Sequence, residues 1–229
     1  MKQLINELNQ RCNEDLSDKV LIEILTNLVN KNVINEYIHS LLDKRIVDIK
    51  GYEHQLGFYK FIISEVGGKY PRRVRLHFWK LGEVHEDVHD HITSFASRVL
   101  HGTILSKNFV LNDDGEKYYH KKFIAVGHNC EPYVENLEVK NLSQVGQFQI
   151  NSSEVYYVNF EDLHCIEPVS EYAITLVIQN SPIQRNINVY SKQLHSYDLS
   201  CTAKYLDSAT MYKVLEKIYF LLEKENANA

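Results

Sequence analysis

Apolar residues recur every three or four positions from residue 1 to about residue 47, which predicts helices. In the segment 17–30, Ser17 or Asp18 can cap the amino terminus of a helix. The apolar positions on its one face are Val20, Leu21, Ile24, Leu25 and Leu28. A second helix is expected over residues 33–44, with Ile34, Tyr37, Ile38, Leu41 and Leu42 on one side. Each helix has one apolar face to bury, so we expect both to pack against the rest of the fold.

From Arg73 onward the period changes to two. Residues 73–79 place Val74, Leu76 and Phe78 in alternation with Arg73, Arg75 and His77, which predicts a half-buried strand. The segment 95–127 is expected to form two strands joined by a hairpin turn at Asp113-Asp114-Gly115. Further short strands are expected over 133–142, 147–160, 172–180 and 186–192, and a last helix over 211–226.

A run of short strands without intervening helices is typical of an antiparallel sandwich or barrel. The chain has 229 residues, which suits one domain with a large core. We therefore expect a mainly β protein in a single domain, residues 1–229. Its parts would be a helical layer over 1–50, a β-barrel over 70–192 and a C-terminal helix over 207–225.

The composition excludes some classes of partner. The formal net charge is −5 and the pI is about 6.1, which favours neither nucleic acid nor an anionic membrane surface. No apolar run is long enough to span a membrane, and the amino terminus does not have the pattern of a signal peptide. The four cysteines are Cys12, Cys130, Cys165 and Cys201. They form no CxxC pair, so we expect reduced thiols in a cytoplasmic protein, with Cys165 in core packing.

Three histidines are arranged as a metal centre inside a β-barrel would require. His89 and His91 are two residues apart in a segment expected to be a strand, so their side chains point to the same side. His164, at the start of a later strand, offers a third nitrogen. Two imidazoles on one face can bind a first-row transition metal with little rearrangement. The alternative is chance: the chain has eleven histidines, and two of His85, His89 and His91 could face solvent beside acidic neighbours.

The residues around these histidines resemble the cupin superfamily, whose first motif has the form G-x5-H-x-H-x3,4-E-x6-G. Here His89-x-His91 is followed by Phe95 where the shorter form has glutamate, and Gly102 stands six residues later, as the motif requires. Gly82 lies one residue farther from His89 than the motif has it. His164 occupies the place of the second-motif histidine, although Asn159-Phe160-Glu161 replaces the usual P-x-G. The resemblance covers roughly residues 70 to 182 and implies a jelly-roll barrel.

Within that superfamily, a three-histidine centre that lacks the glutamate is similar to the cysteine dioxygenase type. The H-D-H triplet, the V-L-H-G ending at Gly102 and the H-x-x-E-P run at His164 agree with it. The N-terminal helical layer agrees as well. This resemblance implies an Fe(II) centre that uses O2 to oxidise a small amino-acid-like or thiol substrate.

The chain also departs from the thiol dioxygenases. Thr175 to Gln179 occupy the late strand where that family has Ser-x-His-x-Tyr, so the histidine and the tyrosine are both missing. Phe95 and Ala96 stand where some members have a cross-linking cysteine. Tyr70-Pro71-Arg72 resembles the site of the carboxylate-binding arginine, with a shorter gap to His89.

Four residues are the candidates for substrate binding: Arg72, Arg73, Tyr157 and Gln179. The two arginines rank above Arg75 and Arg98 as partners for a substrate carboxylate. In the expected strand at residue 95, alternation places Phe95 and Ser97 on the side of His91 and Arg98 on the outside.

Three functions fit these patterns. The leading one is a non-heme iron oxygenase that acts on a small amino-acid-like or thiol substrate. The second is another metal-assisted reaction on a non-thiol substrate in a specialised pathway, favoured by the missing histidine and tyrosine. The third is a non-catalytic cupin that binds a metabolite.

Overall fold

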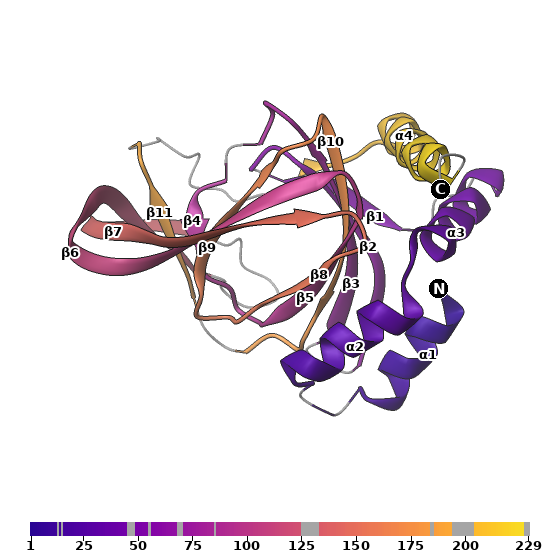
Figure 1. Ribbon diagram of the computed structural model, residues 1–229, viewed down its shortest axis with the longest axis horizontal. Helices are drawn as coiled ribbons and strands as arrows, with labels where there is room; N and C mark the ends of the chain where they lie inside the picture. The colour runs from indigo at the N-terminus through magenta and orange to yellow at the C-terminus, as the bar shows by residue number, and fades with distance from the viewer. Residues whose placement is uncertain are drawn as a thin grey trace.

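The computed structural model describes residues 1–12, 14, 16–44, 49–54, 56–67, 71–84, 86–124, 133–183, 186–193 and 204–226. Four residues discussed above lie outside these ranges: Tyr70, His85, Cys130 and Cys201. The fold is mainly β, with two antiparallel sheets and helices at both ends of the chain (Figure 1).

Helices form where the 3.6-residue period predicted them. They are α1 (Lys2–Gln10), α2 (Asp18–Leu28), α3 (Lys31–Asp43) and, at the other end of the chain, α4 (Ser208–Asn226). The Ser17 hydroxyl accepts a hydrogen bond from the Val20 amide at the start of α2, and the Asn30 side chain caps α3 in the same way. All four helices lie on one side of the molecule, against the sheet that contains β3, β10 and β5 (Figure 1).

In the described chain, the first sheet has the strand order β12-β1-β2-β3-β10-β5-β8 and the second β11-β4-β9-β6-β7. The strands of the first sheet are β1 (Lys50–Glu53), β2 (Tyr59–Val66), β3 (Arg72–Lys80), β5 (Phe95–His101), β8 (Val155–Val158), β10 (Tyr172–Gln179) and β12 (Lys204–Tyr205). Those of the second are β4 (Val88–His89), β6 (Thr103–Ile124), β7 (Tyr133–Asn151), β9 (Leu163–Pro168) and β11 (Ile187–Ser191).

Eight of these strands pair in a nested pattern. β6 pairs with β7, β5 with β8, β4 with β9 and β3 with β10, all antiparallel. This is one long hairpin rolled up so that successive pairs fall alternately into the two sheets, which is the topology of a jelly roll. The cupin-type jelly roll expected from the sequence is confirmed.

Two details of the strand predictions were wrong. β1 and β2 were not expected, because helices were extended to about residue 50 and strands were begun only at Arg73. The hairpin at Asp113-Asp114-Gly115 does not form either, since β6 continues through it. Leu142 of β7 is the register partner of both Leu111 and Glu116, so the residues between them bulge out of the strand. β7 pairs with β6 along nearly its whole length, so β6 continues past the three residues whose sequence favours a turn.

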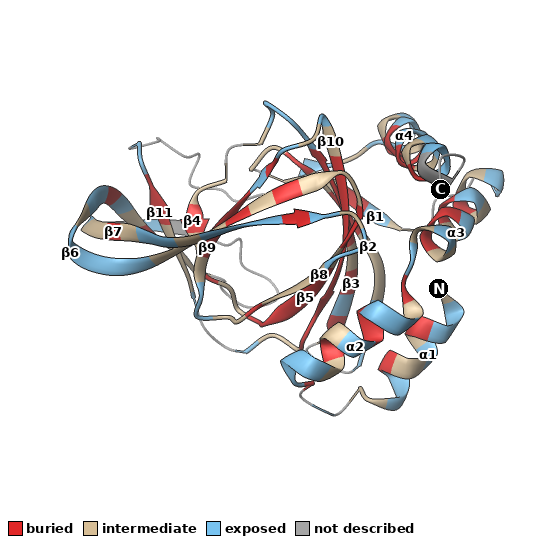
Figure 2. Ribbon diagram, viewed as in Figure 1, coloured by how far each residue is buried: buried red, intermediate tan, exposed pale blue. Residues whose placement is uncertain are grey.

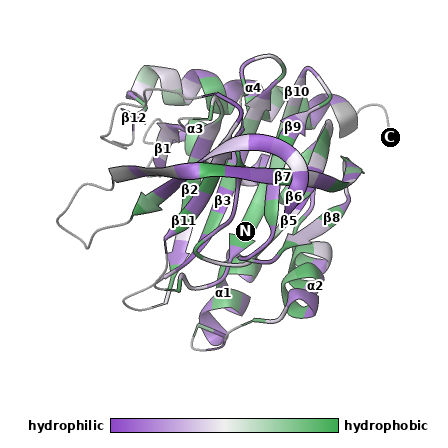
Figure 3. Ribbon diagram, turned by 90° about the vertical axis from the view of Figure 1, so that its left-hand side faces the viewer, coloured by the Kyte–Doolittle hydropathy of each residue, from purple (hydrophilic) through white to green (hydrophobic). Residues whose placement is uncertain are grey.

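The first sheet has an apolar outer face and a polar inner face. Val74, Leu76 and Phe78 of β3 pack in the large core cluster under the helices, where Figure 2 shows β3, β5 and β10 largely buried. Arg75 and His77 point the other way and line a cavity between the sheets. The alternation in β3 was predicted, but its polar side faces this cavity. In Figure 3 the helices α1 and α2 carry both green and purple positions, as amphipathic covering helices do.

Gly102 joins the two sheets at the turn between β5 and β6. Its φ is +74°, and a Cβ atom there would lie 2.2 Å from the carbonyl oxygen of Tyr172. Only glycine adopts this conformation in so little space. This glycine therefore fixes the corner at which the chain leaves β5 of the first sheet and enters β6 of the second.

A candidate metal centre in the barrel cavity

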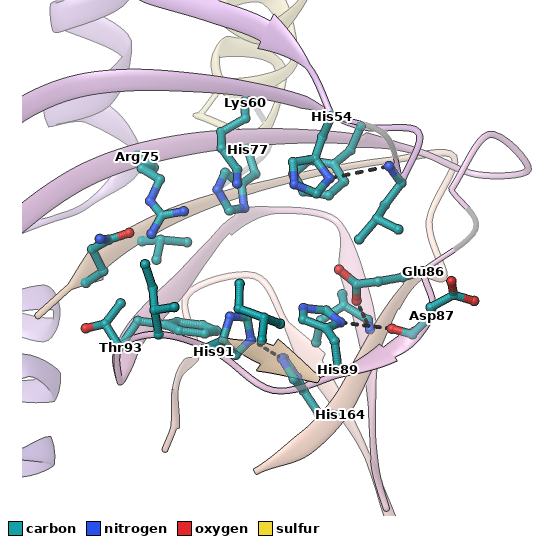
Figure 4. A pocket seen from close by; sticks show the side chains of 18 of the residues that line it. His54, Lys60, Arg75, His77, Glu86, Asp87, His89, His91, Thr93 and His164 are labelled. Carbon is teal, nitrogen blue, oxygen red and sulfur yellow. Dashed lines mark hydrogen bonds between the residues drawn. The ribbon is translucent and has the colours of Figure 1, made fainter. Parts of the chain in front are cut away.

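Two of the three histidines lie on neighbouring strands of the second sheet, and the third lies just beyond the end of one of them. His89 is the last residue of β4, and its register partner across the antiparallel pair is His164 of β9. His91 follows two residues after His89, and its backbone amide donates to the carbonyl of Phe160. Chain segments that are far apart in sequence therefore place three imidazoles side by side on one wall of the cavity (Figure 4).

The ring nitrogens of this cluster converge. One nitrogen from each of His89, His91 and His164 lies within 4.8 Å of the other two. The Nε2 atoms of His91 and His164 are 2.7 Å apart. The Nδ1 atom of His89 lies 2.9 Å from the backbone carbonyl oxygen of Asp87, which can only accept, so Nδ1 carries the hydrogen and Nε2 keeps its lone pair. Such a backbone partner for the second ring nitrogen is typical of metal-ligating histidines.

The environment keeps two of these imidazoles neutral. Burial lowers the pKa of His91 and of His164 well below the ordinary imidazole value, and the neighbouring His89 lowers both further. A neutral imidazole is the form that binds a metal. The donor set of this cluster thus fits a first-row transition metal.

Phe95 occupies the space where the common cupin motif has its glutamate. Its ring centroid lies 4.9 Å from that of His91 and 6.1 Å from that of His164. No carboxylate belongs to the metal-binding group in the described part of the chain. The carboxylates of Glu86 and Asp87, which also line the cavity, are engaged with the Ile166 amide and the Ser191 hydroxyl. The centre therefore has three nitrogen donors and an apolar ring beside them.

The histidines open into a cavity of about 380 Å³, a size that suits a small molecule. Figure 4 shows Arg75, His77, Lys60 and His54 in a row along the first sheet, opposite the row that contains His91 and His89. Aromatic rings close one part of this wall: Phe58 stacks on Trp79 with ring centroids 4.1 Å apart and on His54 at 4.5 Å. The cavity thus joins a nitrogen-rich wall to a cationic and aromatic wall.

Of the two arginines ranked first for substrate binding, one lies away from the cavity and the other lines it with an exposed side chain. Arg72 is 1% exposed and donates to the backbone carbonyls of Arg11 and Glu14 and to the Asn180 side chain, away from the cavity. Arg73 stands at the cavity lining, but it is exposed and its Nε lies 2.8 Å from Glu65.

Of the other two candidates, one lines the cavity and the other does not. Gln179 lines the cavity, is 2% exposed, and its Oε1 atom has no hydrogen-bond partner in the described structure. Tyr157 is partly buried against the core cluster under the helices. Its neighbour Tyr156 lines the cavity instead. Tyr156 pairs with Ser97, on the inward side of β5, so a correct register for β8 would have identified it.

Lys60 is a further lining residue that sequence reasoning missed. It belongs to β2, which was not expected to be a strand, and alternation could not be applied there. Arg75 was considered but ranked lower. By contrast, the interpretation of Cys165 as a core residue is confirmed, because it packs with Val88 and Tyr190 and burial raises its thiol pKa to about 12. Arg98 lies outside the barrel, as alternation predicted, and donates to the carbonyls of Leu25 and Thr26 in α2.

None of the helices in the described ranges combines the length and the apolar composition that a membrane crossing requires.

Comparisons with known proteins give only distant likenesses. No protein-family model matches the chain, and no curated protein matches it. A DMSP lyase structure (RdDddP or RnDddQII) has a TM-score of 0.35 and 13% identity, covering 57% of this chain and 51% of the lyase, so the chain spans about half of that protein.

Two further structures are similar to the same degree. Hydroquinone 1,2-dioxygenase PnpCD, in complex with Cd2+ and 4-hydroxybenzonitrile, has a TM-score of 0.35 and 12% identity over 64% of this chain and 75% of that one. The structure of CENP-C of Drosophila melanogaster, bound to CAL1, has a TM-score of 0.39 and 7% identity. The match covers 64% of this chain and 99% of that one. Likenesses this weak assign no activity, so the functional argument rests on the site itself.

Proposed function

We propose that this protein is a non-heme iron oxygenase of the cupin class, in which His89, His91 and His164 hold Fe(II) and a small substrate is oxidised with O2. The observation that carries the proposal is the convergence of three imidazole nitrogens within 4.8 Å at one wall of a cavity. Ferrous iron on neutral nitrogen ligands supplies the redox chemistry of non-heme oxygenases. We also propose that the protein is cytoplasmic, because its cysteines are scattered along the sequence.

The residues around the histidines have separate tasks in this proposal. The Asp87 carbonyl orients the ring of His89 through Nδ1. Phe95 packs against His91 and His164 and keeps water from that side of the centre. Gln179, Tyr156 and the cationic wall opposite would bind and orient the substrate.

The substrate class is open between two alternatives. An amino-acid-like thiol follows from the sequence resemblance to the cysteine dioxygenases. A non-thiol substrate is favoured by one observation: Val177 and Gln179 of β10 stand at the sequence positions where that family has its late histidine and tyrosine. Val177 and Gln179 both line the cavity, and neither a valine nor an amide side chain offers the acid–base group of that family.

The test is to purify the protein without a nickel column, load it with ferrous iron under anaerobic conditions, and measure bound metals by elemental mass spectrometry. Near-stoichiometric iron is expected in the wild type and less than a tenth of it in His89→Ala. The matched control is His39→Ala, an exposed histidine of α3 that should leave iron binding unchanged.

Oxygen uptake by the iron-loaded protein is then screened with cysteine, other small thiols and thiol-free amino acids. Uptake with a thiol supports the thiol dioxygenase, and uptake with a thiol-free amino acid supports the alternative. A wild-type protein that takes up no metal even after ferrous loading contradicts the oxygenase and leaves a metabolite-binding cupin.

A further inference from the structure

The cationic wall of the cavity has a feature that the metal centre does not use. Lys60 and His77 are register partners on β2 and β3, and Arg75 is two residues from His77 on the same face. Side chains at such diagonal positions are within reach of one another in an antiparallel sheet. The three polar groups therefore form a triangle on the first sheet, opposite the three histidines (Figure 4).

Within the described residues, these groups have no ion-pair partner, and two of their nitrogen atoms have no hydrogen bond. Neither Lys60 nor Arg75 has an acidic side chain within ion-pair distance in the described structure. The Arg75 Nε atom and the His77 Nε2 atom are buried without a hydrogen bond. The Lys60 ammonium lies 5.6 Å from the ring centroid of Tyr52 and 5.7 Å from that of Phe58, so aromatic faces are its nearest recorded contacts.

The other charges of the cavity do have partners. Glu65 neutralises Arg73 at the surface. Glu86 accepts from the backbone of β9, and Asp87 bonds to Ser191. Buried cations without a counter-ion are costly unless a ligand supplies the opposite charge. Burial, with each cation's effect on its neighbours, lowers the pKa of Lys60 well below its ordinary value and that of Arg75 to about 10, and a bound anion would reverse both shifts.

We propose that Lys60, Arg75 and His77 form a binding site for a doubly negative phosphate head group on a small molecule whose other end reaches the three histidines. Two cations match two negative charges, and the planar fork of Arg75 with the Lys60 ammonium and a ring nitrogen of His77 match three phosphate oxygens. Phe58 and Trp79 beside the triangle offer an apolar surface to the carbon chain next to the head group. The reach of this molecule to the three histidines rests on the proposed function, whereas the phosphate site itself does not.

The test is calorimetric titration of the full chain after chelation of all metal, at about pH 7.5. Propyl phosphate is doubly ionised there, because the second pKa of a phosphate monoester is about 6. Butyrate is the singly charged comparison, butyramide the neutral one, and inorganic phosphate the free anion. We expect one propyl phosphate per chain, butyrate at least about tenfold weaker, and no binding of butyramide. Equal affinity for inorganic phosphate would make the free anion the ligand and overturn an organic phosphate.

Variants locate the site. Arg75→Met and Lys60→Met should each weaken propyl phosphate at least about tenfold. Arg73→Met, which removes the same charge two residues earlier on the same strand, should weaken it less than about threefold, since that arginine is exposed and paired. Equal losses of affinity in all three variants would mean that any nearby positive charge contributes to binding, which would overturn the assignment. So would unchanged affinity in Arg75→Met and Lys60→Met.

Two readouts guard against misfolding and against confusion with the metal centre. Trp79 is the one tryptophan of the chain and lines the cavity, so its emission in the wild type should change on titration with propyl phosphate. No heat and no emission change in the wild type would overturn the proposal without any variant. Because the protein is metal-free here, phosphate binding can succeed where iron loading fails, and the reverse, so the two failures are distinguishable.

Discussion

His89 and His164 are register partners across β4 and β9, so the antiparallel ladder itself sets two of the three nitrogen donors opposite each other. A register pair of this kind is held by backbone hydrogen bonds on both sides, and its side chains start from adjacent positions on one face. The geometry of the candidate centre therefore depends on strand pairing.

Metal binding should stabilise this centre measurably. At ferrous ion concentrations a hundred times the dissociation constant, the native state gains about 2.7 kcal/mol, which raises the melting temperature by roughly 5–10 °C for a chain of this size. Anaerobic differential scanning fluorimetry with and without ferrous iron measures this shift. His39→Ala should keep the shift and His164→Ala should lose it, each compared with its own metal-free form. A full shift in His164→Ala would remove that residue from the ligand set.

Phe95→Glu restores the carboxylate of the common cupin motif. Its side chain would replace a ring that touches His91 and His164, so the new carboxylate would reach the same ion. Without metal we expect a loss of about 1–3 kcal/mol from the buried polar group and the lost packing. With metal we expect a larger thermal shift than in the wild type. Phe95→Leu is the control, and an equal metal-induced shift in the two variants would contradict a carboxylate ligand at this position.

Arg72→Met should lower stability rather than substrate affinity. The guanidinium holds the carbonyls of Arg11 and Glu14 against the barrel, together with Asn180. Removing it breaks the hydrogen bonds from a charged group to these two carbonyls and to Asn180, which costs about 1–3 kcal/mol in the free energy of unfolding. Urea denaturation measures the loss. The exposed Arg73→Met should change stability by less than about 0.5 kcal/mol. A catalytic defect in Arg72→Met without a loss of stability would return this arginine to the list of substrate ligands.

The metal-free protein should lose stability as the solution becomes more acidic. Burial lowers the pKa of His54 and of His77 well below the ordinary value of about 6.5, and the charge of Lys60 lowers both further. When the pH falls through 6.5, the unfolded chain takes up these protons before the native chain does. Each histidine then removes up to about 1.4 kcal/mol of unfolding free energy per pH unit. Urea titrations between about pH 7.5 and pH 5 should show this slope, and His77→Gln should reduce it. An identical slope in both proteins would contradict a buried neutral His77.

The sequence predicted the jelly roll and the three-histidine cluster because both depend on alternation within strands. His89 and His91 share a side of the chain wherever the backbone is extended, and Phe95 and Ser97 follow the same rule. Alternation also predicted β3 correctly, but it could not say which face the helices would cover. The apolar face is under the helices, so Arg75 and His77 face the cavity, where an isolated strand pattern would leave them in solvent.

The substrate side of the cavity was predicted less well, for two physical reasons. Lys60 lies on β2, whose apolar residues Phe61 to Ile63 form a continuous run without a two-residue period. Arg72 precedes Arg73 by one position, and adjacent residues of a strand point to opposite faces. The choice between a structural and a binding arginine thus depended on a one-residue register that only tertiary packing determines.

The nested strand pairing has a consequence for how the centre comes into being. β6 and β7 are consecutive in the sequence, whereas β4 and β9 enclose both them and the β5–β8 pair. Each inner hairpin shortens the loop that the next pair must close, so the entropy cost of pairing β4 with β9 falls as the inner pairs form. His91 and His164 are 73 residues apart and meet only after these steps. Under the proposed function, a folding intermediate that has formed only its inner hairpins would lack a complete ligand set, and a nascent chain would bind the ion only after β9 has been synthesised and paired.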